Sequence, residues 1–352
     1  MGNKKSRPNK NNNKNNTINS NNSINPINTF SSNNAIIYDN TIISNNTINI
    51  PKLKLDKFFD NVSSIYYCFE LIDGRLFLCI CGYSFDIYNI NQLDKNKKEL
   101  EINPGIYTVS STQLHTGIIV ICTYGQDMKF FSIENNEVKE IQTITAEDDR
   151  ENFVSELSNG QLITMNWYGR IKLYDLKNGL YEEVKCFQPF QSFNASKMKE
   201  IEENIIVIRG WNISNEDSKD PLYLCYLNTQ KIKLIKETCI DFDIMTNKNI
   251  IIFNKYSIDI FSFKTLQIIK SISIEINLKS ACLYNDNTLL IGSEKVLTVF
   301  KMNANELIEL QKINVDLNDD HYISQIIKLK KNNSKDLSNK VTEIKEINFK
   351  MF

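Results

Sequence analysis

The sequence has 352 residues, a net charge of −1, eight cysteines and two histidines, and 41% of its residues are hydrophobic. A chain of this length can bury a large apolar core without disulfides, and its near-neutral charge argues against attraction of the whole protein to nucleic acid. Its apolar runs, such as 118–122 and 205–208, are far shorter than the roughly 18 residues of a membrane-spanning helix.

The cysteines and histidines do not form a metal-binding pattern. A zinc site needs about four clustered nitrogen or sulfur ligands, but the sequence has no CxxC motif and its histidines, His115 and His321, lie far apart. We therefore expect no metal, no cofactor and no catalytic centre. Most cysteines lie in apolar runs, where a thiol behaves as a small hydrophobe, which fits the reducing cytoplasm.

The first 46 residues are predicted to form a disordered, basic, asparagine-rich tail. Asparagine occupies 18 of the first 50 positions, and the first acidic residue is Asp39. Such a polar segment cannot bury enough apolar surface to offset the entropy lost on ordering.

The start of this tail matches the N-myristoylation motif, with Gly2 after the initiator Met and Ser6 at the hydroxyl position. A myristoyl chain alone binds membranes only marginally. Attraction to an anionic leaflet would add to it through five basic residues: Lys4, Lys5, Arg7, Lys10 and Lys14. The motif predicts a cytoplasmic protein that binds peripherally to the cytosolic side of a membrane; the alternative is an unmodified tail that acts as a spacer.

From about residue 60 a unit of about 43 residues recurs. Each unit contains a turn dipeptide, and the second residues of these dipeptides are 43, 43, 44, 45 and 38 residues apart: Asp73-Gly74, Thr116-Gly117, Asn159-Gly160, Glu203-Asn204, Lys248-Asn249 and Asp286-Asn287. Glycine and asparagine tolerate the positive φ that tight hairpins need. A short run rich in β-branched residues follows each turn, which favours a strand covered on both faces.

Four strands in about 43 residues are typical of a β-propeller blade; a β-sandwich or a solenoid is the alternative. The segment 167–179, WYGRIKLYDLKNG, resembles the third strand of a WD40 repeat, with Tyr174-Asp175 in the place of the usual Trp-Asp pair. Weaker versions occupy 85–92, 128–137 and 297–306, and the Gly-His dipeptide of that family is absent.

The sequence therefore predicts an all-β, WD40-like β-propeller over residues 47–352. It has seven blades, or six if the terminal segments do not close the last one. The blades are expected near 60–103, 106–144, 152–190, 196–237, 240–275 and 279–316, with a last blade made of 321–352 and 47–55.

Aromatic and basic residues recur in the loop between the second and third strands of the predicted blades. These loops share one face with the links that enter the next blade. The face is rich in the residue types that dominate protein interfaces: Tyr83, Tyr124, Arg150, Trp167, Tyr168, Arg170, Arg209, Trp211, Tyr256 and Lys295. We expect these residues to bind a partner protein or peptide; the alternative is that the aromatic side chains seal the seams between blades.

The predicted function is that of a non-enzymatic protein-interaction scaffold tethered to a cytosolic membrane face. One alternative is a soluble propeller that presents substrates within a multisubunit complex, such as a ubiquitin ligase. Another is a phosphoinositide-binding propeller, although only Arg209-Gly210 matches part of the Phe-Arg-Arg-Gly motif of that family. An enzyme that uses the centre of the propeller would need several convergent carboxylates or histidines.

Overall fold

The computed structural model describes residues 35–38, 53–57, 65–80, 82–89, 98–125, 127–145, 151–212, 220–294, 296–303, 306–314, 325–328 and 347–351. The regular elements in these ranges are all β-strands, and the described residues include no helix that could cross a membrane. All of the strands belong to the compact unit formed by residues 32–352.

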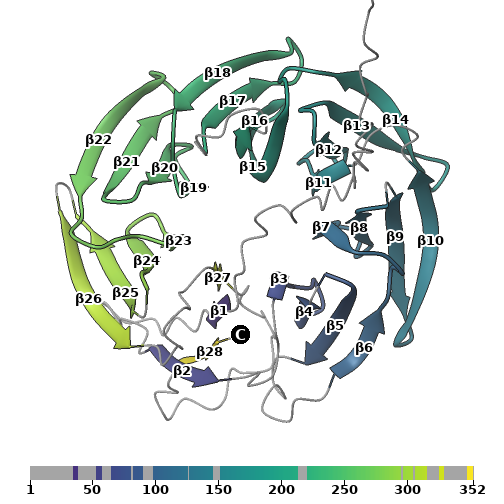
Figure 1. The fold of residues 1–352 in the computed structure, drawn as a ribbon, viewed down its shortest axis with the longest axis horizontal. Helices are drawn as coiled ribbons and strands as arrows, with labels where there is room; N and C mark the ends of the chain where they lie inside the picture. The colour runs from purple at the N-terminus through teal and green to yellow at the C-terminus, as the bar shows by residue number, and fades with distance from the viewer. Residues whose placement is uncertain are drawn as a thin grey trace, which may run out of the picture. The chain divides into compact units, whose positions relative to one another are not determined.

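Six four-stranded sheets of consecutive strands form a six-bladed β-propeller (Figure 1). Blade 1 comprises β3 (Ile65–Glu70), β4 (Arg75–Ile80), β5 (Ser84–Asn89) and β6 (Lys98–Ile102). Blade 2 comprises β7 (Thr108–Gln113), β8 (Ile119–Thr123), β9 (Asp127–Glu134) and β10 (Glu137–Thr145). Blade 3 comprises β11 (Glu151–Glu156), β12 (Leu162–Asn166), β13 (Ile171–Lys177) and β14 (Leu180–Phe187).

Blade 4 comprises β15 (Phe193–Glu202), β16 (Ile205–Asn212), β17 (Leu222–Tyr226) and β18 (Lys231–Lys236). Blade 5 comprises β19 (Asp241–Ile244), β20 (Ile250–Phe253), β21 (Ser257–Ser262) and β22 (Gln267–Ser273). Blade 6 comprises β23 (Ser280–Asn285), β24 (Thr288–Gly292), β25 (Val296–Met302) and β26 (Leu307–Asn314). Neighbouring strands pair antiparallel in chain order, and in Figure 1 the first strand of each blade is innermost and the fourth outermost.

A seventh sheet combines strands from both ends of the chain: β1 (Ala35–Tyr38), β2 (Leu53–Lys57), β27 (Gln325–Lys328) and β28 (Ile347–Met351). Its order is β2-β28-β1-β27, and two of its pairings are parallel, unlike those of the six blades. β27 contacts β23 and β24 of blade 6 and β3 of blade 1. The all-β propeller was predicted correctly, and six is the lower of its two predicted blade counts. β1 lies within the range predicted as a tail, whereas 1–34 and 39–46 lie outside the described residues.

The blades are held together by apolar cores between neighbouring sheets. Consecutive residues of β16 show how this works: Ile206 and Ile208 belong to the core shared with blade 3, whereas Val207 belongs to the core shared with blade 5. Because successive side chains of a strand point to opposite faces, a strand between two blades must be apolar at consecutive positions. This requirement explains the runs of β-branched residues seen in the sequence.

The recurring turn dipeptides lie between the first and second strands of the blades. At Gly117 and Gly160 the φ angles are 89° and 84°, in the left-handed region that favours glycine. Both turns contain a buried leucine, Leu114 or Leu157. The next residue donates a backbone hydrogen bond to the following blade: His115 N donates to Glu156 Oε2 at 2.6 Å, and Ser158 N donates to Glu200 Oε2 at 2.5 Å. One repeated turn therefore closes a hairpin and ties two blades.

The resemblance to a WD40 third strand has a structural counterpart in β13. Tyr174 is buried in the core between blades 2 and 3, where burial raises the pKa of its hydroxyl. Asp175 accepts a hydrogen bond from Gln161 Nε2 at 2.7 Å. The Tyr-Asp pair thus places an aromatic ring in the core and a carboxylate against Gln161, just before the second strand.

Candidate functional site

The loops between second and third strands are tied to the links that enter the next blade. Thr108 N, where the chain enters blade 2, donates to Gly82 O in the loop of blade 1 at 2.5 Å. Ile274 N and Leu278 N, in the link to blade 6, donate to Tyr256 O and Lys255 O in the loop of blade 5 at 2.9 and 3.1 Å. The loops and links therefore form one continuous face of the propeller, as antiparallel strands of alternating direction require.

Three tyrosines in the corresponding loops of their blades stand out on this face. Tyr83, Tyr168 and Tyr256 are 61%, 55% and 54% exposed, and they belong to blades 1, 3 and 5. We call the surface formed by Tyr83, Tyr168 and Tyr256 the tyrosine face. Tyrosine is intermediate between the buried and the exposed residue types, and each of these three side chains is more than half exposed.

The loop that carries Tyr168 is rigid. Asn166 Oδ1 accepts hydrogen bonds from the backbone N–H groups of Tyr168 at 3.0 Å and Arg170 at 2.8 Å. Gly169 has a φ of 82°, and a Cβ at this position would lie 2.5 Å from Phe190 Cβ. Gln188 Nε2 donates to Tyr168 O at 3.1 Å. These contacts fix the backbone of Tyr168.

The other two tyrosines are supported by neighbouring side chains. Tyr83 contacts Tyr107 edge to face with 5.4 Å between ring centroids, and Tyr107 contacts Tyr124 in the same way at 6.4 Å. Lys255 Nζ lies 5.2 Å from the centroid of the Tyr256 ring, within the range of a cation–π interaction. Tyr107 links blades 1 and 2 in this surface, a role that its position outside the hairpin loops did not indicate.

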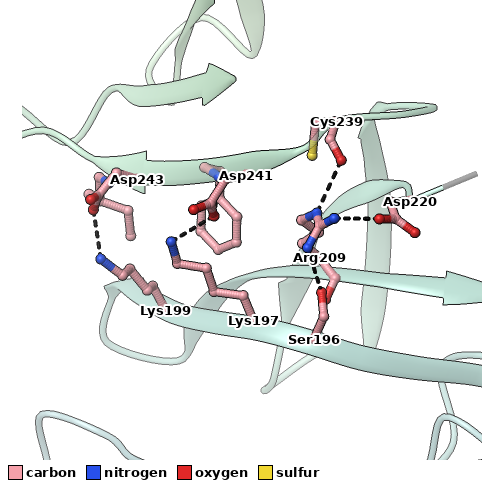
Figure 2. Close-up of polar contacts among 10 residues, drawn as sticks. Ser196, Lys197, Lys199, Arg209, Asp220, Cys239, Asp241 and Asp243 are labelled. Carbon is pink, nitrogen blue, oxygen red and sulfur yellow. Dashed lines mark hydrogen bonds and ion pairs between the residues drawn. The ribbon is translucent and has the colours of Figure 1, made fainter. Parts of the chain in front are cut away.

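Arg209 is not available on the surface, because its guanidinium group bridges several elements (Figure 2). Its Nε donates to Cys239 O at 3.1 Å, one terminal nitrogen donates to Ser196 Oγ at 3.0 Å, and the other pairs with Asp220. Burial raises the pKa of the Asp220 carboxyl, and the nearby guanidinium only partly offsets this rise. Burial likewise raises the pKa of the Cys239 thiol, to about 12.

Two further ion pairs join the innermost strands of blades 4 and 5. Lys197 Nζ lies 2.7 Å from Asp241 Oδ1, and Lys199 Nζ lies 2.6 Å from Asp243 Oδ1 (Figure 2). Burial lowers the pKa of Lys197, but the two aspartates outweigh it and the net shift is upward. Burial raises the pKa of Asp243, but the two lysines and two hydrogen bonds lower it below its usual value.

Sequence reasoning missed these pairs although a signal was present. Lys197 and Asp241 are 44 residues apart, as are Lys199 and Asp243, and this distance is one repeat. A Lys-x-Lys pattern in one first strand and an Asp-x-Asp pattern one repeat later would have predicted the contact.

The remaining predicted site residues are either half-buried or outside the described residues. Tyr124, Trp167, Arg170 and Trp211 are half-buried, and the indole Nε1 of Trp167 is buried with no hydrogen-bond partner among the described residues. Eight predicted residues lie outside the described residues: Gly2, Lys4, Lys5, Arg7, Lys10, Lys14, Arg150 and Lys295.

Comparison with known proteins supports the fold. No protein-family model and no curated protein sequence matches the chain. A chain of the crystal structure of the mitotic checkpoint complex is similar, with a TM-score of 0.56 and 9% identity over 84% of this chain and 85% of that one. Sqt1 from Saccharomyces cerevisiae matches with a TM-score of 0.45 and 12% identity over 59% of this chain and 62% of its own, less than two thirds of its length. Both structures are WD40 propellers.

Proposed function

We propose that the protein is a protein-interaction scaffold without enzymatic activity, and that the tyrosine face binds its partner protein or peptide. The observation that carries the proposal is the exposure of Tyr83, Tyr168 and Tyr256 in corresponding loops on one face. The likeness to solved propellers concerns the fold alone, so the proposal depends on this surface.

Tyrosine suits such a surface because it offers a large apolar ring and a polar hydroxyl at a low entropic cost. Arg170 is two residues from Tyr168 in the chain, and tyrosine and arginine are both enriched among the residues that dominate binding energy. The hydrogen bonds of Asn166 and the tight packing of Gly169 keep the Tyr168 loop in one conformation. A preorganised loop loses little freedom on binding, which favours affinity.

The test compares the wild-type protein with a triple variant, Tyr83→Ser, Tyr168→Ser and Tyr256→Ser. Both are purified by affinity tag from the protein's own cells, and the co-purifying proteins are identified. The expected result is the loss of at least one stable partner with no change in Tm, because the three rings are exposed. Retention of every partner by the folded triple variant would contradict the proposal.

A matched control removes exposed apolar side chains elsewhere on the molecule. Leu176 and Leu180 are exposed near the β13–β14 hairpin, and the Leu176→Ser, Leu180→Ser variant is expected to keep the partners. If this control loses the same partners, general surface hydrophobicity explains the binding. A screen of the purified wild-type protein for hydrolase activity tests the non-enzymatic part of the proposal.

The phosphoinositide alternative receives no support from Arg209. Its guanidinium donates to Cys239 O and Ser196 Oγ and pairs with Asp220. An arginine held in this way would have to leave a half-buried carboxylate before it could bind a lipid phosphate.

We also propose that a myristoyl group on Gly2, together with the basic residues that follow, tethers this cytoplasmic scaffold to the cytosolic face of a membrane. The sequence match to the acylation motif and the cluster of lysines support this proposal. The intact mass of the N-terminal peptide from the protein's own cells tests it. A peptide heavier by one myristoyl group, and a Gly2→Ala variant lost from membrane fractions, are expected; an unmodified peptide removes the tether.

A further inference from the structure

The outermost strand of blade 4, β18, combines exposed lysines with exposed apolar side chains. Its sequence is KIKLIK, and residues 231–234 are all exposed. Ile232 and Leu234 are 38% and 46% exposed. This strand is the last in the order β15-β16-β17-β18, so one edge of its backbone pairs with no other described strand.

The two apolar side chains lie on the side of β18 that faces blade 3. Ile232 is opposite Cys225 and Leu234 is opposite Tyr223 in the pairing with β17. Directly opposed residues of an antiparallel pair share one face of the sheet. Cys225 belongs to the core between blades 3 and 4, and Tyr223 packs against that core. Ile232 and Leu234 therefore extend this apolar face to the outer rim.

The two lysines lie on the opposite side of β18. Lys233 is opposite Leu224 and Lys231 is opposite Tyr226, and both of these β17 residues contribute to the core shared with blade 5. β18 thus has an apolar side and a cationic side, separated by the pleat of the strand.

The positive charges of Lys231 and Lys233 in β18 have no acidic partner in the part of the chain that the structure describes. Within the described residues neither Lys231 nor Lys233 has an ion pair, whereas Lys236 lies 2.8 Å from Asp259. The other outer strands either contain acidic residues, as in β6, β10, β14 and β26, or use their lysine, as in β22, where Lys270 Nζ donates to Asn303 O at 2.8 Å.

A second copy of this chain is a poor occupant for the edge. In an antiparallel pairing of two β18 strands, the register that matches both exposed apolar side chains, with Ile232 opposite Leu234, places Lys233 opposite Lys233, which is destabilising. The basic N-terminal segment of the chain carries the same sign of charge.

We propose that the free edge of β18 binds an extended acidic segment of a partner protein, which adds to blade 4 as a fifth strand. Alternate residues of the segment are acidic and face Lys231 and Lys233, and the intervening apolar residues face Ile232 and Leu234. Main-chain hydrogen bonds supply affinity in this mode of recognition, and the alternating side chains supply specificity. This rim site is separate from the tyrosine face, so either proposal can fail without the other.

The test uses a fluorescent peptide of alternating glutamate and valine, and its binding to the full chain is measured by fluorescence anisotropy. The variant Lys231→Glu, Lys233→Glu should bind about tenfold more weakly, since two attractive cross-strand pairs become repulsive. The same variant should bind a peptide in which lysine replaces glutamate. Lys139→Glu, an exposed lysine on the outer strand β10, is the matched control and should bind like the wild type.

Strand addition is tested separately by N-methylation of the peptide. Only every second N–H of an added strand faces β18, so methylation of one alternate set should abolish binding and methylation of the other should not. Equal binding of both methylated peptides, wild-type binding by the double variant, or no binding of the parent peptide to the wild-type chain would each overturn the proposal.

Discussion

Two seams of the propeller, each an interface between neighbouring four-stranded blades, differ in their polar contacts. Between blades 4 and 5, Lys197–Asp241, Lys199–Asp243 and Lys236–Asp259 join charged groups of opposite sign across the seam. Between blades 2 and 3, the Glu156 carboxylate accepts from His115 N, but the outermost strands are joined by a neutral contact. There the side-chain amide of Gln142 both donates to Tyr181 O at 2.8 Å and accepts from Tyr181 N at 2.9 Å.

Aromatic stacking adds to the second seam. The rings of Phe130 and Tyr181 lie 5.3 Å apart with 15° between their planes, and Phe130 is fully buried. Both seams also contain a continuous apolar core. The comparison teaches that the apolar core carries the architecture, while the polar contacts determine how each seam responds to salt and pH.

The largest effect is expected from the apolar part of the seam between blades 2 and 3. Phe130→Ala should lower the free energy of unfolding by about 3–5 kcal/mol, because it leaves a cavity between two blades. Urea unfolding at low and high salt measures the loss, which should be the same at both. A loss of stability that depends strongly on salt would contradict the assignment of the salt response to the polar contacts alone.

Removal of the guanidinium group from the other seam should have the next largest effect. Arg209→Met removes the guanidinium contacts to Asp220, Ser196 and Cys239 O. The free energy of unfolding should fall by about 2–3 kcal/mol, which is less than for a fully buried pair because Asp220 is partly exposed. Thermal and urea unfolding measure the change. The control Arg209→Met, Asp220→Asn removes the orphaned charge and should recover part of the stability; no recovery would show that packing, not charge, dominates.

A smaller effect is expected for the neutral polar contact between blades 2 and 3. Gln142→Ala removes two hydrogen bonds to the backbone of Tyr181 and should cost about 1–2 kcal/mol, with little dependence on salt. Gln142→Glu keeps the acceptor and loses the donor, so its cost should be at least as large. Wild-type stability in both variants would show that water replaces the amide without loss.

The smallest effect concerns pH. Asp243 has a pKa below its unfolded value of about 3.9, so its carboxylate stabilises the fold above that value, and this contribution is lost as pH falls through the folded pKa. Asp243→Asn should cost about 0.5–1 kcal/mol near neutral pH, because Lys199 is partly exposed. Urea midpoints measured from neutral to acidic pH should converge for variant and wild type; a constant difference would exclude the ion pair as its cause.

The repeat was predictable because its signals are local. Gly117 and Gly160 occur where the backbone needs a positive φ. Consecutive residues of β16 must be apolar, because both faces of its blade pack against a neighbouring blade. The order of the seventh sheet was not predictable in this way, since β1 pairs with β27 across nearly the whole chain.

The candidate site was predictable only in part. The face that carries Tyr83, Tyr168 and Tyr256 follows from counting strands, but nothing local distinguishes the exposed Tyr168 from the half-buried Trp167 beside it. Arg209 looked like a surface residue in the sequence, and its engagement depends on Cys239, which lies 30 residues later.

The sequence by itself determined the strands, the hairpins and the period of about 43 residues, since turn propensity and the alternation of side chains act over a few neighbouring positions. The tertiary structure alone decided which polar side chains meet across a seam and which aromatic rings remain exposed. Burial and ion pairing depend on what the neighbouring blade places opposite each residue, and that neighbour lies one repeat away in the chain.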